Sequence, residues 1–338
     1  HMNAAEQTIC LNAQCPDGGL LQSEDWRALK GQSGFATEHF ESECLWANSI
    51  EHTLPIVGKY WYIPRGPVLI GGQALERCSE WTRILTEAKK RGVAWVRIEP
   101  KNDAELATAR TWSGVCAIKK SPHDMQPREI LVVDISGSEA DIFARMKPKT
   151  RYNIRLAEKR GVELVSDRSE AALGEFLRMN RETAKRNRIS MHPDRHYRAL
   201  LESFPPDKLE LFTARHDGKI FAAILVAFFG DTATYLHGAS SDDDRGLMAP
   251  YFLQWCAVRA ARYRGCVRYD FGGVDTIGSA PNLSGVTRFK QGFAKNVNAI
   301  QYPGSYDIVL IPSRYRLYTA VSMSKSFVIK AKRHLTKR

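Results

Sequence analysis

Hydrophobic and polar positions along the chain form two blocks that share one order of elements. In the second block, turn signals at Asp217-Gly218 and Gly230-Asp231 separate three apolar stretches, which predicts strands joined by tight hairpins. The predicted strands cover residues 209–215, 219–229 and 233–237. Apolar residues at helical spacing then predict a helix over 250–264, which ends at Gly265 and leads into a strand over 267–271.

The first block is less regular but has the same order. It predicts strands over 35–45, near Ile50 and over 60–70, then a helix over about 73–91 and a strand over 94–99. The segments KKRGVAWVRIEP and RYRGCVRYDFGG are one helix, glycine and strand junction repeated 173 residues apart, which indicates duplication of a domain. A third such junction, AEKRGVELV, begins the second copy, so we expect the boundary near Pro148.

Length and composition agree with two domains. A chain of 338 residues with 43% hydrophobic content can form two ordinary cores. The sequence shows no secretory leader, which would have a charged region, an apolar region and small residues in that order. It also shows no apolar run long enough to span a membrane, so a cytoplasmic location is expected. The seven cysteines are odd in number and contain no C-x-x-C pair, which argues against a disulfide framework and a zinc site and favours reduced thiols.

The net charge of +12 is confined to two segments. Residues 145–160 carry seven basic side chains and one acidic side chain, and the tail from Ser313 carries eight basic side chains and no acidic one. Such clusters attract the phosphates of RNA, of a nucleotide diphosphate or of an anionic membrane. The alternative is that both are solvated helix faces.

Five short landmarks between Tyr235 and Asp307 follow one another where strand ends meet helix starts, the usual position of ligands in alternating α and β elements. They read TYLHGASS, APYFLQW, YDFGGV, GVTRFKQGF and YPGSYD. Together with LLQSEDWRALK, GKYWYIPRGPV and KPKTRYNIRLAEKRGV, they resemble the Fem family of peptidoglycan bridge-forming aminoacyltransferases over nearly the whole chain.

The resemblance implies an α+β fold of two tandem GNAT-like domains, each a mixed sheet flanked by helices. We expect residues 1–147 plus 313–338 in the first domain and residues 148–312 in the second. The C-terminal helix from about Ser313 is expected to pack on the first domain. No sustained heptad run is present, so the coiled-coil arm of some family members is expected to be absent.

The activity that the resemblance implies is aminoacyl transfer from aminoacyl-tRNA to an amine of a peptidoglycan precursor, UDP-MurNAc-pentapeptide or lipid II. The ester on tRNA is already activated, so positioning and charge stabilisation can suffice without a covalent nucleophile. We therefore expect direct attack by the acceptor amine, a monomeric enzyme, no cofactor and no metal. The basic C-terminal helix could contact the inner membrane surface or tRNA.

Catalytic candidates come from RFKQGF and YDFGGV. Lys290 could stabilise the developing oxyanion or hold the tRNA terminus, a role assigned to the matching Phe-Lys pair in the family, although a surface lysine is the alternative. Phe289 could stack on the terminal adenine or fill the core. The acceptor amine must lose a proton before attack, and Asp270 and Asp275 are both candidate bases. Asp270 also suits a cap on the glycine turn.

The precursor candidates follow the family pattern, and the tRNA candidates come from the basic segment 145–160. The expected precursor contacts are Lys30, Arg195, Tyr197, Tyr235 and Tyr251. The arginine position is ambiguous, because Arg198 qualifies as well as Arg195. Relatives often have tyrosine where this chain has His237, which could alter substrate preference or leave a core histidine. The expected tRNA phosphate contacts are Lys147, Lys149, Arg151 and Arg155.

Competing functions differ in acceptor or donor. One alternative keeps the tRNA donor and modifies a peptide antibiotic or another small amine; another is a non-catalytic protein that binds RNA or membranes through its basic segments. A third is an acetyl-CoA N-acetyltransferase, which is disfavoured because Met248 and Ala249 replace glycine-like positions and Pro250 removes an N–H donor where the pyrophosphate would bind. The sequence does not identify the transferred amino acid or decide between a soluble and a lipid-linked acceptor.

Overall fold

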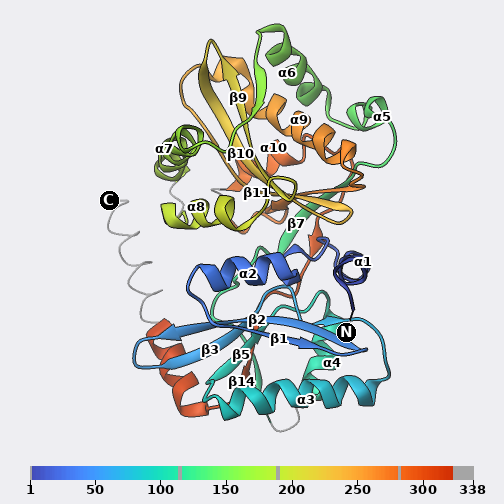
Figure 1. The fold of residues 1–338 in the computed structure, drawn as a ribbon, viewed down its shortest axis with the longest axis vertical. Coiled ribbons are helices and arrows are strands. Elements are labelled where there is room, and N and C mark those ends of the chain that lie inside the picture. Colours follow the sequence, from blue (N-terminus) through green and yellow to red (C-terminus); the bar gives the residue numbers. More distant parts are fainter. Residues whose placement is uncertain (1, 113–115, 188–190, 281–282, 323–338) are drawn as a thin grey trace. The chain divides into compact units, whose positions relative to one another are not determined.

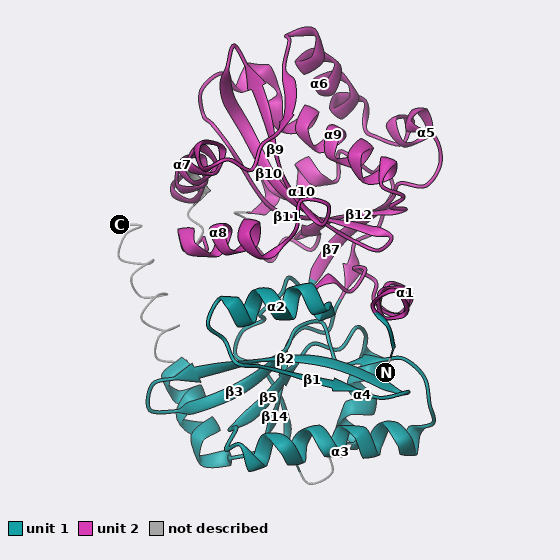
Figure 2. Ribbon diagram, in the orientation of Figure 1, with its two compact units in different colours: residues 1–3, 21–128, 302–338 teal, residues 4–20, 129–301 magenta. Residues whose placement is uncertain are grey.

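The computed structural model describes residues 2–112, 116–187, 191–280 and 283–322, which form two compact units (Figures 1 and 2). Unit 1 contains the described residues of 1–3, 21–128 and 302–338, and unit 2 contains those of 4–20 and 129–301. Each unit has one mixed sheet flanked by helices. This arrangement confirms the predicted α+β fold of two units, each a mixed sheet flanked by helices.

The sheet of unit 1 has the order β1-β2-β3-β5-β14-β6, with β4 paired to β2. Its strands are β1 (Thr37–Glu41), β2 (Leu45–Leu54), β3 (Gly58–Ile63), β4 (Val68–Leu69), β5 (Trp95–Ile98), β6 (Ile118–Lys120) and β14 (Tyr306–Val309). Its helices are α2 (Glu24–Gln32), α3 (Ala74–Lys90) and α4 (Asp103–Trp112). Strands β3 and β5 are parallel because α3 returns the chain between them.

The sheet of unit 2 has the order β13-β7-β12-β11-β10-β9-β8, and its parallel pair is β11 and β12. Its strands are β7 (Glu129–Asp134), β8 (Glu163–Ser166), β9 (Leu209–His216), β10 (Lys219–Phe229), β11 (Thr232–Ser240), β12 (Arg268–Gly273) and β13 (Ile300–Gln301). Its helices are α1 (Ala4–Gln14), α5 (Glu139–Ala144), α6 (Pro148–Lys159), α7 (Glu170–Asn187), α8 (Asp194–Ser203), α9 (Ala249–Tyr263) and α10 (Ser284–Lys290). Short 3₁₀ turns are η1 (Leu20–Gln22) and η2 (Arg245–Leu247).

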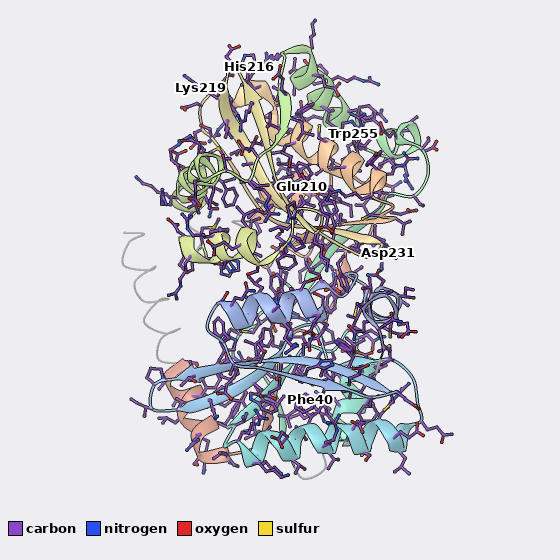
Figure 3. All side chains as sticks on the ribbon, viewed as in Figure 1. Phe40, Glu210, His216, Lys219, Asp231 and Trp255 are labelled. Carbon is purple, nitrogen blue, oxygen red and sulfur yellow. The ribbon has the colours of Figure 1, made fainter. Side chains whose placement is uncertain are left out.

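The hairpins predicted in the second block are present, and so are the helices predicted in both blocks. In the first block, the strand expected over 35–45 ends at Glu41, and the one expected over 60–70 is divided into β3 and β4. His216 and Lys219 flank the Asp217-Gly218 turn between β9 and β10 (Figure 3). Helix α9 is buried in the core of unit 2 on more than one side: Leu253 is fully buried there, and Trp255 contacts Phe143 of α5 with ring centres 5.3 Å apart. In unit 1, Phe40 on β1 packs against Trp61 on β3.

Helices cover both faces of the unit 2 sheet. The core that contains α6 and α9 includes Ala222, Ile224 and Val226 of β10. Because side chains alternate along a strand, Leu225 lies on the opposite face, where α7 and α8 contact the sheet. The two faces therefore have separate helical neighbours, which matters for the side chains of β11.

The limits of the two units differ from the expected ones. Unit 2 begins at residue 129 rather than 148 because β7 pairs antiparallel with β12. The chain returns to unit 1 at residue 302 rather than 313 because β14 pairs with β5 and β6. In addition, α1 belongs to unit 2, where Arg268 donates to the carbonyl of Asn12 over 2.8 Å.

The C-terminal helix begins near residue 312 and packs on unit 1, as predicted, through Tyr315 and Tyr318, whose rings contact Trp95. Most basic side chains of the predicted tail patch lie beyond residue 322, outside the described residues. The longest described helix, α7, has 18 residues, and the described ranges contain no coiled-coil arm. Within those ranges, no helix combines the length and apolar character needed to cross a membrane.

Candidate functional site

A β-bulge in β11 determines which side chains face α9. Tyr235 pairs with Val226 and Gly238 pairs with Ile224. Tyr235 and Gly238 are three positions apart on β11, whereas their partners on β10 are two positions apart, so β11 contains one extra residue. The extra residue keeps Tyr235 and Gly238 on the α9 face of the sheet and places His237, which pairs with Leu225, on the α7 and α8 face. Bulges of this kind are common beside functional sites because they redirect one side chain.

A cavity of about 260 Å³ lies in unit 2 between this face of the sheet, α9 and α10. Among the predicted site residues it brings together Tyr235, Tyr251, Phe289 and Lys290. The remaining lining residues are Thr183, Ala222, Ile224, Gly238, Ala239, Ser240, Pro250, Gln254, Gly285 and Val286. The cavity is therefore mostly apolar with a few polar groups, as ligand sites usually are.

Lys290 is the charged residue of the cavity lining. Its side chain is 8% exposed, and its ammonium donates to the carbonyl of Gly273 over 2.7 Å and lies 5.7 Å from the Tyr235 ring centre. Burial lowers the pKa of Lys290 to about 8, and the negative charge of Asp270 limits this fall. The ammonium is consequently still charged at neutral pH but is only partly compensated.

Asp270 shapes the turn on which Lys290 rests. Its Oδ1 accepts from the N–H of Gly272 over 2.7 Å, and Gly272 has a φ of 71°, which glycine adopts without strain. Asp270 therefore caps the glycine turn and acts electrostatically on Lys290. The second predicted base, Asp275, accepts from Ser279 and Ala280, and these hydrogen bonds lower its pKa, so it is a poor proton acceptor.

Aromatic rings form one wall of the site. Tyr251 and Phe289 make an edge contact with ring centres 4.9 Å apart, and Phe293 lies 5.4 Å behind Phe289. Phe289 is half-buried, whereas Phe293 is 2% exposed. Phe289 thus presents part of its ring to the cavity while Phe293 fixes it from the core side.

Tyr235 is held by an internal polar chain. The hydroxyl of Tyr269 donates to Gln254 Oε1 over 2.8 Å, and the Gln254 side chain is also hydrogen-bonded to Tyr235. Burial raises the pKa of Tyr235 to about 12, so its hydroxyl stays protonated and can donate. Sequence reasoning missed Gln254, although it is the one amide side chain within the apolar stretch APYFLQWCAV, a signal that could have identified it.

The predicted phosphate contacts lie on α6, next to the end of α10. The N–H of Lys147 donates to the carbonyl of Gly292 over 2.9 Å, so the N-terminus of α6 adjoins the segment that carries Lys290. Lys147, Lys149 and Arg155 are exposed. Arg151 donates to the carbonyl of Ala144 over 2.8 Å and is half-buried, so it is partly engaged within unit 2.

Three predicted precursor contacts lie outside this cavity. Lys30 is on α2 of unit 1, where its ammonium lies over the Trp26 ring at 4.8 Å and burial lowers its pKa. Arg195 is exposed on α8. Tyr197 is fully buried against Phe176, so we do not place it among the residues that touch a ligand.

Metal-ligating side chains gather elsewhere in unit 2. Among the described residues, the group that could hold a metal ion is His192, His196 and His237, on the opposite face of β11 from the cavity. The seven cysteines are all free thiols, and burial raises the pKa of Cys256 to about 12. That thiol is therefore unsuited to act as a nucleophile.

Comparison with known proteins identifies relatives over most of the chain. A sequence model of the FemAB family matches residues 106–219 and 212–323. The UDP-N-acetylmuramoylpentapeptide-lysine N(6)-alanyltransferase of Weissella viridescens is 28% identical over 89% of this chain and 92% of its own length. The lipid II:glycine glycyltransferase of Staphylococcus haemolyticus is 22% identical over 90% of this chain and 91% of its own length.

The fold also has a counterpart among solved structures. The crystal structure of FemX superposes with a TM-score of 0.78 at 18% sequence identity, covering 94% of this chain and 98% of that chain. At this level of identity the similarity concerns the fold, and the chemistry must be argued from the cavity.

Proposed function

Because the chain belongs to the FemAB family, we propose that it transfers an aminoacyl group from aminoacyl-tRNA to an amine of a peptidoglycan stem peptide. The acceptor is UDP-MurNAc-pentapeptide or lipid II, in line with the names of the two relatives that match most of the chain. The single observation that carries the assignment is the buried Lys290 ammonium at the wall of an aromatic cavity. The reaction is proposed to occur in the cytoplasm with the chain acting as a monomer, in peripheral contact with the membrane when the acceptor is lipid-linked.

Lys290 stabilises the transition state of this reaction. When the acceptor nitrogen attacks the ester carbon, negative charge develops on the carbonyl oxygen, and a fixed cation in a site with little water stabilises that charge strongly. The hydrogen bond to Gly273 holds the ammonium in place before the reaction, so little reorganisation is needed. The tetrahedral intermediate then expels the tRNA ribose oxygen, which takes up the proton that the attacking nitrogen loses, so that an amide and a free ribose hydroxyl are formed.

The two sides of the cavity suit the two substrates. Phe289 presents a ring face on which the terminal adenine can stack, and the exposed Lys147 and Lys149 on α6 lie where phosphates of the acceptor stem would approach. Tyr235 and Tyr251 line the remaining wall, where the Tyr235 hydroxyl can donate to a carbonyl of the stem peptide. Lys30 and Arg195 remain proposed contacts of the precursor phosphates or sugar.

The acceptor ammonium must be deprotonated before it attacks. Asp270 is the proposed acceptor of that proton, through its position beside Lys290 and Gly272. The same carboxylate raises the pKa of Lys290, so removing it should weaken both the charge and the turn. Asp275 is excluded from this role because its oxygens already accept from Ser279 and Ala280.

Coenzyme A is a poor donor for this site. Pro250 has no N–H, and the N–H of Tyr251 already donates to the carbonyl of Met248 over 3.0 Å. The start of α9 therefore offers few of the N–H donors that a pyrophosphate requires. This local geometry supports tRNA, rather than acetyl-CoA, as the source of the acyl group.

The proposal is tested by a transfer assay on the purified chain. A panel of charged tRNAs is incubated with UDP-MurNAc-pentapeptide or lipid II, and products are identified by mass spectrometry. Lys290→Met, which keeps the volume of the side chain, should lower kcat/KM by about 100- to 1,000-fold, as loss of one oxyanion donor does. The exposed Lys219 on β10 supplies the control variant Lys219→Met, which should retain activity.

Two results would overturn the assignment. One is the absence of transfer by the wild-type chain from every charged tRNA to either acceptor. The other is equal activity of Lys290→Met and Lys219→Met, which would show that the buried ammonium does not act in the reaction. Acetyl transfer from acetyl-CoA at a comparable rate would instead favour an acetyltransferase.

A further inference from the structure

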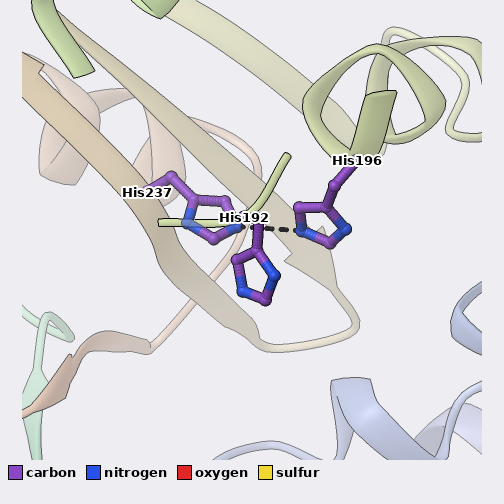
Figure 4. Close-up of side chains that lie close together, drawn as sticks. All are labelled: His192, His196 and His237. Atoms are coloured by element: carbon purple, nitrogen blue, oxygen red, sulfur yellow. Dashed lines mark hydrogen bonds between the residues drawn. The ribbon is translucent and has the colours of Figure 1, made fainter. Parts of the chain in front are cut away.

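Three histidines converge on the α7 and α8 face of the unit 2 sheet (Figure 4). His192 lies just before α8, His196 lies in its first turn, and His237 lies on β11. Each offers a ring nitrogen, and these three nitrogens all lie within 4.8 Å of one another. Residues from two elements far apart in sequence therefore present three imidazoles to one point.

The distance between two of these nitrogens fits a shared metal ion. His196 Nε2 and His237 Nε2 are 3.3 Å apart. Two nitrogens bound to one tetrahedral Zn²⁺ at about 2.0–2.1 Å lie about 3.3–3.4 Å from each other. The pair thus has the required separation already, and the third nitrogen must move inward by at most about 1.5 Å to reach the same spacing.

The neighbouring aromatic ring supports this arrangement. The buried Tyr197 packs edge-on against His237 with ring centres 4.9 Å apart and against His196 with ring centres 5.4 Å apart. Packing of this kind limits the rotamers of both imidazoles, which is what a defined ligand set needs. His192 is exposed, so its side chain can adjust to an ion without disturbing the core.

We propose that His192, His196 and His237 bind one divalent transition metal ion of the Zn²⁺ class. Three neutral imidazoles suit Zn²⁺, Ni²⁺ or Cu²⁺, whereas Mg²⁺ and Ca²⁺ require oxygen ligands. A water molecule completes the four-coordinate shell on the exposed side of His192. The site ties the start of α8 to β11.

This site is separate from the cavity chemistry. The bulge in β11 directs Tyr235 to the cavity and His237 to the opposite face of the sheet. The ion therefore does not touch the reacting atoms, and it acts by fixing β11 behind Tyr235. Metal binding is measured without tRNA or muropeptide, so its outcome does not depend on the proposed function.

The test is metal binding by the full chain after removal of metal with a chelator. Zn²⁺ is titrated and followed by calorimetry and by elemental analysis, and Co²⁺ is used as an optical probe of tetrahedral coordination. The wild-type chain should bind one Zn²⁺ ion and show the intense visible absorption of tetrahedral Co²⁺. Zn²⁺ should also raise its melting temperature.

Single variants establish which residues hold the ion. His192→Ala and His237→Gln should each weaken Zn²⁺ binding by more than the roughly 10- to 100-fold that loss of an outer-shell partner causes. His216 on β9 is half-buried in the same unit but outside the cluster, so His216→Ala is the matched control and should bind like the wild type. His192→Ala removes an exposed side chain, so it should fold normally.

Three outcomes would overturn the proposal. They are no Zn²⁺ binding by the wild-type chain, equal binding by the cluster variants and His216→Ala, and a Co²⁺ spectrum dominated by thiolate ligands. The last would assign the metal to cysteines, of which Cys10, Cys78 and Cys116 are partly exposed.

Discussion

The two units share a helix, glycine and strand junction, but the ends of their parallel strands are filled differently. In unit 1, Glu99 follows β5 and is 1% exposed. Its carboxylate accepts from Tyr62 Oη, Arg65 N, Gln126 N and Ser305 Oγ. In unit 2, the matching position of the junction is Gly272, and the nearby Lys290 borders a cavity. Unit 1 therefore has a fully hydrogen-bonded, buried carboxylate at this position, whereas unit 2 has a glycine near a cavity.

The buried charges of the two copies differ in the same sense. Arg97 on β5 makes two hydrogen bonds to Asp307, at 2.7 and 2.9 Å, and a third to Tyr318. At the matching position of β12 stands Asp270, which influences Lys290 at longer range while Lys290 donates to a neutral carbonyl. Removing one partner of a fully paired buried charge destabilises the fold because the other charge stays buried without a partner. A partly compensated charge remains available for a substrate.

Breaking the paired charge should give the largest effect. Arg97→Met leaves Asp307 buried without its partner, so it should lower the free energy of unfolding of unit 1 by about 3–5 kcal/mol. Urea denaturation followed by tryptophan fluorescence measures this change, because six of the seven tryptophans belong to unit 1. Arg110→Met removes an exposed arginine of the same unit and should cost far less. A loss below about 1 kcal/mol for Arg97→Met would show that the pair is not a structural element of unit 1.

Removing the Lys290 charge should change the free energy of unfolding in the opposite direction. The fall in the pKa of Lys290 from 10.5 to about 8 corresponds to roughly 3 kcal/mol of unfavourable charging in the folded state at neutral pH. Lys290→Met should therefore leave unit 2 as stable as the wild type or more stable, while its transfer activity falls.

The pH dependence of stability sharpens this prediction. The folded pKa of Lys290 is below the unfolded one, so between about pH 8 and pH 10.5 the unfolded chain binds more protons. Wild-type stability should then rise with pH across this window through Lys290, and the rise should be absent in Lys290→Met. Urea midpoints measured at several pH values provide the comparison, and parallel curves for the two proteins would refute the depressed pKa.

Local patterns in the sequence were enough to predict the duplicated scaffold. Turn residues and apolar spacing predicted β10 over its full length and α9 within one residue at each end. The unit limits were not predictable in this way, because β7 and β14 join sheets through pairings between distant residues. Their positions depend on which edge hydrogen bonds are available, and no short pattern encodes that.

The site was only partly predictable for a similar reason. The landmarks around Lys290 and Tyr235 identified residues that share the cavity, since Tyr235 lies within the predicted strand β11 and Lys290 ends the short helix α10. Tyr197 was expected near a ligand but is buried, and the approach of His196 to His237 depends on the α8 and β11 packing. The bulge that separates Tyr235 from His237 leaves no mark in the apolar pattern.

A smaller effect should come from adding a methyl group at Gly238, which lines the cavity of unit 2. A Cβ at this position would overlap the Tyr235 hydroxyl, so Gly238→Ala should displace the ring and lower kcat/KM by roughly tenfold. Overpacking should also cost about 1–3 kcal/mol of stability. Gly174 on α7 has open space around the same position, so the control Gly174→Ala should gain about 0.5–1 kcal/mol instead. Unchanged kinetics for Gly238→Ala would mean that the position of Tyr235 does not matter.

The smallest effect concerns the basic residues at the start of α6 in unit 2, which adjoin the segment that carries Lys290. Lys149→Ala on α6 should weaken tRNA binding to a similar extent for every tRNA and reduce the slope of log affinity against log salt by about 1, because one phosphate contact is lost. Lys90 at the end of α3 in unit 1 is also exposed, and Lys90→Ala should leave the slope unchanged. Fluorescence anisotropy with labelled tRNA over a series of salt concentrations measures both slopes. If the two variants lose the same slope, the tRNA is held by the diffuse positive charge of the whole chain, and the contrast between the units does not extend to this surface.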